Sequence, residues 1–188
     1  MEPDGKRLVD RIRNGDPQAA VALVDLFYER IYAFLRRLSG QDADAADLTQ
    51  RTFTRVWQAL PSYAAQSSVV SWIHGIARHV YLDWHRRERR SEARPDEWWA
   101  AHPATAPGPD ELAARSDLSS ALFASVETLE PDLRDTIHLH FFQGLTLEET
   151  AEAMGVAVST VKYRQRQAVE LLQQKLAGEP AGARPKSL

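Results

Sequence analysis

Cationic and polar side chains concentrate between residues 159 and 169, and this segment contains no acidic residue. Lysine and arginine neutralise DNA phosphates, whereas glutamine and arginine can also hydrogen-bond to base edges in the major groove. We predict that the segment contacts duplex DNA, in preference to being a solvated helix that is basic by chance. On a helix that turns by about 100° per residue, one face and its flanks would present Ser159, Thr160, Lys162, Tyr163, Arg164, Arg166 and Gln167.

The residues around this segment predict the element that would hold it. Thr146 and Glu149 have the spacing of a capping box, which begins a short helix. Gly155 follows as a turn residue, because glycine adopts a positive φ without steric cost. Ser159 is the candidate cap of a longer helix whose inward face includes Val161. A short helix, a glycine turn and a longer helix form the helix-turn-helix arrangement of many DNA-binding proteins.

A second segment, residues 72–90, mixes apolar, aromatic and cationic side chains on one predicted helix. Its apolar stripe is expected to face the core and consists of Trp72, Ile73, Ile76, Ala77, Val80 and Trp84. A second stripe lies nearly opposite and ends in an arginine block: His74, Arg78, Tyr81, His85, Arg86, Arg87, Arg89 and Arg90. Rings beside cations suit stacking on unpaired bases next to a phosphate backbone. The segment is predicted to bind partly unpaired nucleic acid; the alternative is that these side chains cover a domain edge.

Several classes of function lack the residues that they require. The chain has no cysteine, which excludes thiolate catalysis, disulfides and cysteine-bound zinc. His138 and His140 lack further ligands at a metal-binding spacing, and no pair has the spacing of a nucleophile and its base. We therefore expect no enzyme, no cofactor and no metal site. No apolar run suits a membrane span or a signal peptide, so we expect a cytoplasmic protein with no membrane insertion.

Composition and periodicity divide the chain into segments. The net charge is −3, but residues 1–90 carry 14 Lys/Arg against 11 Asp/Glu and residues 91–117 carry 2 against 6. Apolar residues recur at intervals of three and four on both sides of this acidic stretch. We predict an all-α protein of two small helical domains, residues 1–90 and 117–177, with a flexible acidic, Pro/Ala-rich linker at 91–116 and a disordered tail at 178–188.

Local signals predict several helix boundaries. Gly40 and Pro61 are expected to end helices. Glycine readily adopts the positive φ of a helix end, and proline lacks the amide hydrogen that a helix needs. Short polar side chains accept hydrogen bonds from the first free amides of a helix. The predicted starts are Asp16 before Pro17, Asp42 or Asp44, and Ser67 or Ser68.

The two segments occur in an order that resembles one protein family. The stretch DAADLTQRTFTRVWQALPSY, followed by SSVVSWIHGIARH and an arginine cluster, forms the first block of the resemblance. The second block is LEPDLRDTIHLHFFQGLTLEETAEAMGVAVSTVKYR. Both resemble the sigma-70 superfamily of bacterial RNA polymerase initiation factors, in its extracytoplasmic-function (ECF) class. The resemblance implies two helical domains, called region 2 and region 4, in a factor that binds core RNA polymerase and directs promoter-specific transcription initiation.

Region 2 of this family binds the clamp helices of the polymerase β′ subunit and recognises the −10 element of the promoter. The resemblance implies that core polymerase is bound by Asp47, Leu48, Gln50, Arg51 and Thr54. A loop at residues 62–68 would capture a flipped base, taken out of its stack so that its edges can be read. The resemblance assigns the −10 element to Tyr63, Gln66, Ser67, Ser68, His74, Arg78, His79, Tyr81 and Arg86.

Region 4 of this family reads the −35 element as duplex and docks on the flap of the β subunit. The resemblance therefore gives −35 recognition to the polar and cationic residues at 159–167 named above. Many members are held inactive by an anti-sigma factor, so a partner of this kind is also expected. The alternative function is a stand-alone helix-turn-helix transcriptional regulator, which would leave the polar face at residues 47–58 and the helix at 72–90 without a role.

Overall fold

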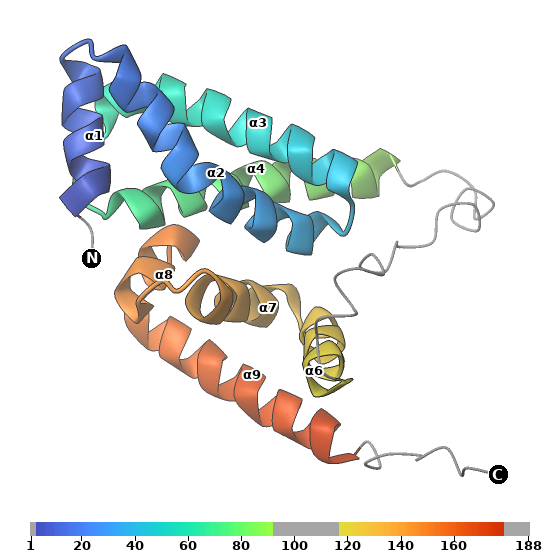
Figure 1. Ribbon diagram of the computed structural model, residues 1–188. Coiled ribbons are helices and arrows are strands. Elements are labelled where there is room, and N and C mark those ends of the chain that lie inside the picture. Colours follow the sequence, from blue (N-terminus) through green and yellow to red (C-terminus); the bar gives the residue numbers. More distant parts are fainter. Residues whose placement is uncertain (1–2, 92–116, 179–188) are drawn as a thin grey trace.

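The computed structural model describes residues 3–91 and 117–178, and within these ranges every regular element is a helix (Figure 1). This confirms the prediction of an all-α protein; the predicted linker from residue 92 to 116 and the tail beyond residue 178 lie outside the described residues. The N-terminal unit contains α1 (Pro3–Arg13), α2 (Pro17–Ser39), α3 (Asp42–Ala59), the 3-10 turn η1 (Leu60–Ser62) and α4 (Val69–Ser91). The C-terminal unit contains α6 (Asp117–Glu127), α7 (Pro131–Ile137), the π-helical turn η3 (His138–Phe142), α8 (Leu147–Met154) and α9 (Val158–Gly178).

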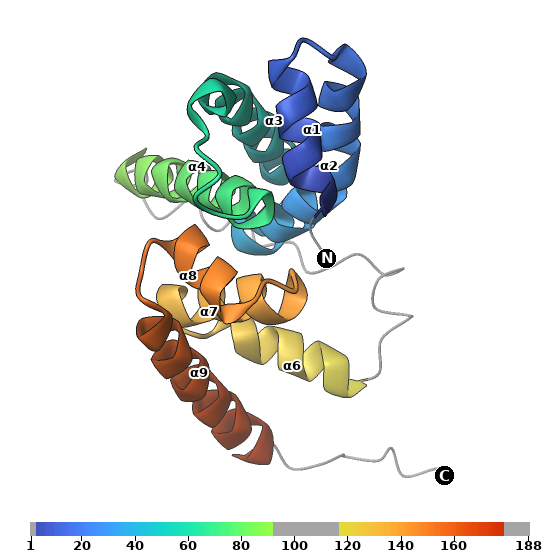
Figure 2. The same ribbon diagram turned by 90° about the vertical axis from the view of Figure 1, so that its left-hand side faces the viewer.

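The central helix of the N-terminal unit is α2, which packs against α1, α3 and α4 (Figure 2). As predicted, Asp16 caps it: the carboxylate accepts hydrogen bonds from the Gln18 and Ala19 amides at 2.9 and 3.3 Å. Gly40 ends α2 in the left-handed region at φ 78°. The helix contributes five large side chains to the fully buried core of this unit: Leu23, Phe27, Ile31, Phe34 and Leu35.

The start of α3 differs from the prediction. The helix begins at Asp42, its N-cap position is Gln41, and no side chain caps it. Asp42 instead accepts hydrogen bonds from Tyr32 and Arg36 of α2. A carboxylate at this position therefore joins two neighbouring helices rather than capping its own.

The C-terminal unit has its own small core and the predicted helix-turn-helix. Thr146 and Glu149 form both hydrogen bonds of a capping box at the start of α8, and Gly155 ends α8 at φ 67°. The next helix, α9, begins at Val158, so the prediction that Ser159 caps it is wrong: Ser159 lies in its first turn. The buried cluster of this unit joins α9 to the helices before it and consists of Val126, Leu129, Leu133, Ile137, Ala168 and Leu172.

The two units pack against each other, mainly where α8 crosses α4 (Figure 1). A Cβ atom on Gly75 of α4 would lie only 3.4 Å from the carbonyl oxygen of Ala153 in α8. A second contact between the units involves Arg37 of α2, which lies over the rings of Phe123 and Phe142 of the C-terminal unit, 4.6 Å from each centroid. The C-terminal unit also adds four side chains to the buried cluster of the N-terminal unit: Leu139, Leu145, Ala153 and Met154.

Candidate nucleic-acid interface

The recognition helix α9 presents its predicted polar face to solvent. Val161 and Ala168 face inward and are completely buried, as the helical period predicted. Tyr163 is 62% exposed, and an exposed phenol of this size can stack or hydrogen-bond in a groove. The other exposed side chains of the predicted set are Ser159, Lys162, Arg166 and Gln167, and Thr160 is half-buried. The arrangement leaves most of the predicted duplex-reading residues accessible together.

Arg164 differs from the other cations of α9. Its side chain is only 19% exposed, and its guanidinium group binds the Asp132 carboxylate of α7. Arg164 is therefore held against its own unit, whereas Lys162 and Arg166 point away from it into solvent.

The outer face of α3 carries four of the five residues assigned to polymerase binding. Asp47, Gln50, Arg51 and Thr54 are exposed, and the Asp47 carboxylate lies 2.6 Å from the Arg51 guanidinium one helical turn away. The polymerase contact predicted for Leu48 is not met in this conformation, because its side chain is completely buried in the core of the N-terminal unit. Leu48 therefore holds α3 in place and cannot contact a partner in this conformation.

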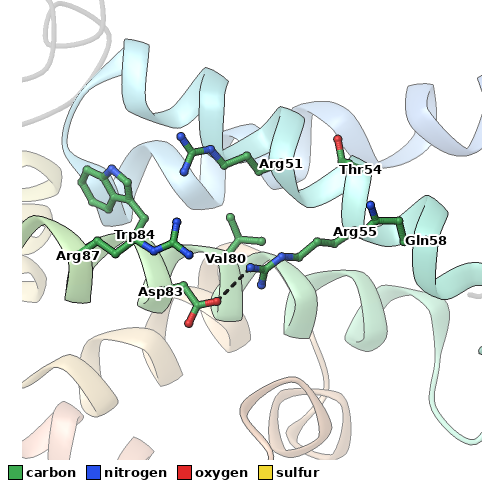
Figure 3. A pocket seen from close by; sticks show the side chains of 8 residues that line it. All are labelled: Arg51, Thr54, Arg55, Gln58, Val80, Asp83, Trp84 and Arg87. Carbon is green, nitrogen blue, oxygen red and sulfur yellow. Dashed lines mark hydrogen bonds and ion pairs between the residues drawn. The ribbon is translucent and has the colours of Figure 1, made fainter.

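A cavity of about 280 Å³ lies beside this face, between α3 and α4 (Figure 3). Three arginines line it, Arg51 and Arg55 of α3 and Arg87 of α4, together with Trp84. Arg55 donates a hydrogen bond to Asp83 at 3.0 Å, which holds the pKa of Asp83 below its ordinary value. The cavity extends the polar face of α3 with cations and one indole ring.

The loop from residue 62 to 68 is built around Tyr63. The Tyr63 hydroxyl donates to the Ser67 carbonyl oxygen at 2.5 Å, and its ring lies 4.6 Å from the Trp72 ring. Tyr63 is only 6% exposed and supports the loop, so the predicted direct contact with DNA is not met in this conformation. Ala65 has a positive φ of 53°, and Gln66 beside it is exposed.

Ser68 has two roles at the start of α4. Its hydroxyl accepts a hydrogen bond from the Ser71 amide at 3.1 Å, which makes Ser68 the predicted helix cap. The same hydroxyl donates to Glu149 of α8 at 2.8 Å. Ser67 next to it is half-buried. One of the two candidate serines of the loop is thus already bonded to the C-terminal unit.

Two residues of the predicted outer stripe of α4 are buried. His74 is completely inaccessible, its Nδ1 lies 2.8 Å from the Val70 carbonyl oxygen, and burial lowers its pKa from 6.5 to about 4. Tyr81 is 4% exposed, stacks on His85, and burial raises its pKa. The prediction that His74 and Tyr81 contact nucleic acid is therefore not met in this conformation.

Arg78 lies at the centre of the same stripe and is 11% exposed. Its Nε donates to Asp135 at 2.8 Å, and its Nη2 lies 3.3 Å from Asp132. Burial raises the pKa of Asp135 above its ordinary value, and Arg78 opposes this shift. His79 and Arg86, by contrast, are exposed on α4. Of the −10 candidates, Gln66, His79 and Arg86 are thus the accessible ones.

His138 and His140, for which the sequence showed no further metal ligands, make hydrogen bonds within the C-terminal unit. His138 is completely buried with Nε2 3.1 Å from Glu127, and His140 Nδ1 lies 2.7 Å from the Leu145 carbonyl oxygen.

Within residues 3–91 and 117–178, no group of three potential ligands could hold a metal ion. None of the helices in the described part of the chain is long and apolar enough to cross a membrane.

Sequence reasoning missed two groups of residues at this interface. The cavity residues Arg55 and Asp83 are far apart in the sequence, and only the packing of α3 on α4 brings them together. Asp132 and Asp135 were not singled out from the sequence, although both bind cations of the predicted DNA-binding set. No local pattern marks such a contact, because it depends on how the two units meet.

Two sequence families account for both units. The model of sigma-70 region 2 matches residues 23–91, and the model of sigma-70 region 4 matches residues 126–174. The helical bundle with a polar α3 face, followed by an exposed helix-turn-helix, thus defines a factor of the sigma-70 type.

Two relatives narrow the assignment from the sigma-70 type to its ECF class. The ECF RNA polymerase sigma factor SigE of Mycolicibacterium smegmatis is 34% identical over 94% of this chain and 69% of its own length. SigX of Bacillus subtilis, also an ECF sigma factor, is 28% identical over 82% of this chain and 81% of its own. The chain belongs to the ECF sigma factors.

Solved structures share the fold. The sigma factor RpoE, in complex with the anti-sigma factor NepR from Bartonella quintana, matches with a TM-score of 0.67 and 25% identity, over 84% of this chain and 96% of that chain. CnrH, in complex with the cytosolic domain of CnrY, matches with a TM-score of 0.70 and 21% identity, over 94% and 99%.

Proposed function

We propose that this chain binds core RNA polymerase and directs promoter-specific transcription initiation by recognising −10 and −35 elements. The observation that carries the proposal is the presence, on one chain, of an exposed recognition helix and of a separate polar face on α3. A protein that only bound duplex DNA would need the first of these surfaces and not the second. The chemistry of RNA synthesis would belong to the polymerase, and this chain would supply recognition without being an enzyme.

The exposed face of α3 is the proposed docking site for the β′ clamp helices. Asp47, Gln50, Arg51 and Thr54 alternate charge and hydrogen-bonding groups along an accessible helix. Such a face suits a polar interface, in which charge complementarity fixes the register of the partner. The cavity between α3 and α4, which Arg55 helps to line, lies next to this face of α3. A second contact, with the β flap, is proposed for region 4.

Promoter recognition is proposed for two surfaces. The accessible side chains of α9, including Lys162, Tyr163, Arg166 and Gln167, would read the −35 duplex. The loop at 62–68 and the accessible residues of α4, including Gln66, His79 and Arg86, would hold the −10 strand. Each contact alone is modest, but the polymerase would hold both at a high effective concentration relative to the promoter.

An anti-sigma factor is a proposed regulatory partner. The solved structure of the sigma factor RpoE contains such a partner, the anti-sigma factor NepR. We expect the chain to act in the cytoplasm, where it would meet both the polymerase and the chromosome.

The direct test is transcription in vitro. Purified protein is added to bacterial core polymerase that lacks any sigma factor, on a pool of promoter fragments. We expect specific transcripts that require the protein, and these transcripts would also reveal the promoter sequence. No transcript, together with salt-sensitive duplex binding by the protein alone, would instead support a stand-alone helix-turn-helix regulator.

A further inference from the structure

Two cavities adjoin between α3 and α4 and form one groove. The first is the cavity of about 280 Å³ shown in Figure 3, and the second has a volume of about 400 Å³. The two adjoin because Arg55 and Gln58 line both of them. Small-molecule sites in proteins are clefts of about 300–1,000 Å³, so the groove is large enough for a ligand of this class. The α3–α4 groove is lined by Arg51, Arg55 and Gln58 of α3 and by His79, Trp84 and Arg87 of α4.

Three arginines converge on the first cavity. Figure 3 shows the guanidinium groups of Arg55 and Arg87 extending toward each other across Val80. Arg51 extends into the same space from α3. Guanidinium groups bind phosphate oxygens through paired hydrogen bonds, and several of them around one small cavity create a strong positive potential. The cavity therefore has the chemistry of a site for a phosphate group with several negative charges.

Nearby carboxylates balance only part of this charge. Asp47 lies 2.6 Å from Arg51, and Asp83 lies 3.0 Å from Arg55. Asp83 also lies 3.8 Å from Arg86, so one carboxylate serves two guanidinium groups. Exposed ion pairs of this kind contribute little free energy each. Phosphate oxygens can therefore replace the carboxylates as partners of these arginines.

An aromatic ring completes the groove. The indole of Trp84 lines it beside the arginines, and its centroid lies 5.9 Å from the Tyr81 ring and 6.4 Å from the His85 ring. The Trp84 side chain is half-buried, so part of the indole remains accessible. Bases stack on rings of this kind, largely independently of which base it is. Gln58 adds an exposed amide that can hydrogen-bond to the edge of a base.

The grouping of the cations favours a free nucleotide over a DNA strand. A nucleoside di- or triphosphate carries its phosphates as one compact group. A strand instead carries one phosphate for each nucleotide, spaced along its backbone. Three guanidinium groups around a cavity of about 280 Å³ match the compact group better than the spaced one.

We propose that the α3–α4 groove binds a free nucleoside di- or triphosphate, whose phosphates contact Arg51, Arg55 and Arg87 and whose base stacks on Trp84. The inference goes beyond the proposed function, because it assigns a small ligand to the chain alone. It does not depend on binding to core polymerase or to a promoter.

Isothermal titration calorimetry of the full chain measures the binding directly. The probes are ATP and GTP, with pyrophosphate and adenosine as partial ligands that carry only the phosphates or only the base and sugar. We expect ATP and GTP to bind with similar affinity, because stacking tolerates either base. Both should bind about tenfold more tightly than pyrophosphate, because pyrophosphate lacks the stacked ring. Adenosine, which lacks the phosphates, should bind more weakly still.

The charge of the groove is tested with Arg55→Gln/Arg87→Gln. The matched control is Lys6→Gln/Arg7→Gln, which removes two positive charges from exposed positions on α1. We expect the first variant to bind ATP at least tenfold more weakly than wild type, because charge-assisted hydrogen bonds are lost. The control should stay within about twofold of wild type, because exposed charges outside the groove are screened by salt.

The stacking contact is tested with Trp84→Leu. Its matched control is Trp57→Leu, because both tryptophans pack, partly buried, against the same hydrophobic core and Trp57 does not line the groove. We expect Trp84→Leu to weaken ATP binding about fivefold and to leave pyrophosphate binding unchanged, since only the base meets the indole. Trp57→Leu should change neither.

A variant of unchanged size keeps the test independent of folding. Gln58→Glu places a negative charge at an exposed position shared by both cavities, and it should weaken ATP binding about tenfold by repelling the phosphates. Circular dichroism checks that all variants keep the helix content of wild type.

Four results would each overturn the inference. They are no measurable binding of ATP or GTP, equal binding by the groove variants and their controls, pyrophosphate binding as tight as that of ATP, and stronger displacement of ATP by random 12-nucleotide DNA strands than by GTP at equal nucleotide concentration. None of these measurements includes polymerase, so failure of the inference and failure of the proposed function are distinguishable.

Discussion

Removing the buried imidazole of α4 should change how stability depends on pH. His74 is completely inaccessible, its ring lies 5.7 Å from the Phe34 ring, and its pKa is about 4 in the folded chain against 6.5 when exposed. The folded state thus holds His74 neutral, while the unfolded state takes up a proton below pH 6.5. Stability from the neutral imidazole is present above pH 6.5 and is lost as the pH falls toward 4.

The size of this effect follows from the two pKa values. At pH 5 the unfolded imidazole is almost entirely charged and the folded one is still mostly neutral, so the linkage amounts to about 2 kcal/mol relative to neutral pH. His74→Leu keeps an apolar side chain of similar size beside Phe34 and removes the titration. We therefore expect wild type to lose about 2 kcal/mol more than His74→Leu between pH 7.5 and pH 5.

Guanidinium chloride unfolding at the two pH values measures this difference. Tryptophan fluorescence and circular dichroism should report the same transition, so that a single free energy of unfolding applies. The other titrating groups, such as Asp135 beside Arg78, are present in both proteins and cancel in the comparison. Equal pH dependence in wild type and His74→Leu would refute the conclusion that the folded chain lowers the pKa of His74 and holds it neutral.

Three further predictions address the separate surfaces. Asp47→Ala should weaken binding to core polymerase, measured by fluorescence titration, while the circular dichroism spectrum stays unchanged; unchanged affinity would remove Asp47 from the docking face. Arg166→Ala should reduce discrimination between −35 variants by roughly tenfold, the size of one lost base contact, and undiminished selection in transcription assays would exclude that role. Thr146→Ala should lower the free energy of unfolding by about 1 kcal/mol, because it removes the capping hydrogen bond of α8; an unchanged denaturation midpoint would contradict the capping assignment.

The features that could be predicted from sequence are those that neighbouring residues determine. Asp16 before Pro17, Gly40 and the Thr146 capping box each act within one or two turns of chain, and each lies where it was expected. The inward face of α9 was also predictable, because a single period describes a helix with one buried side. Ser159 shows the limit of such signals, since a serine can cap a helix or lie in its first turn, and here the helix begins at Val158.

Two residues of α4, His74 and Tyr81, differ from the prediction because this helix has more than one buried side. A helical wheel assigns one apolar stripe to the core and everything opposite to solvent. In α4 the stripe with Ile73 and Val80 packs into region 2, but the other side with His74 and Tyr81 is buried as well, where region 4 and neighbouring rings cover it. The reason for Leu48 is different. A family motif groups it with polar neighbours that face outward, whereas its own side chain is buried.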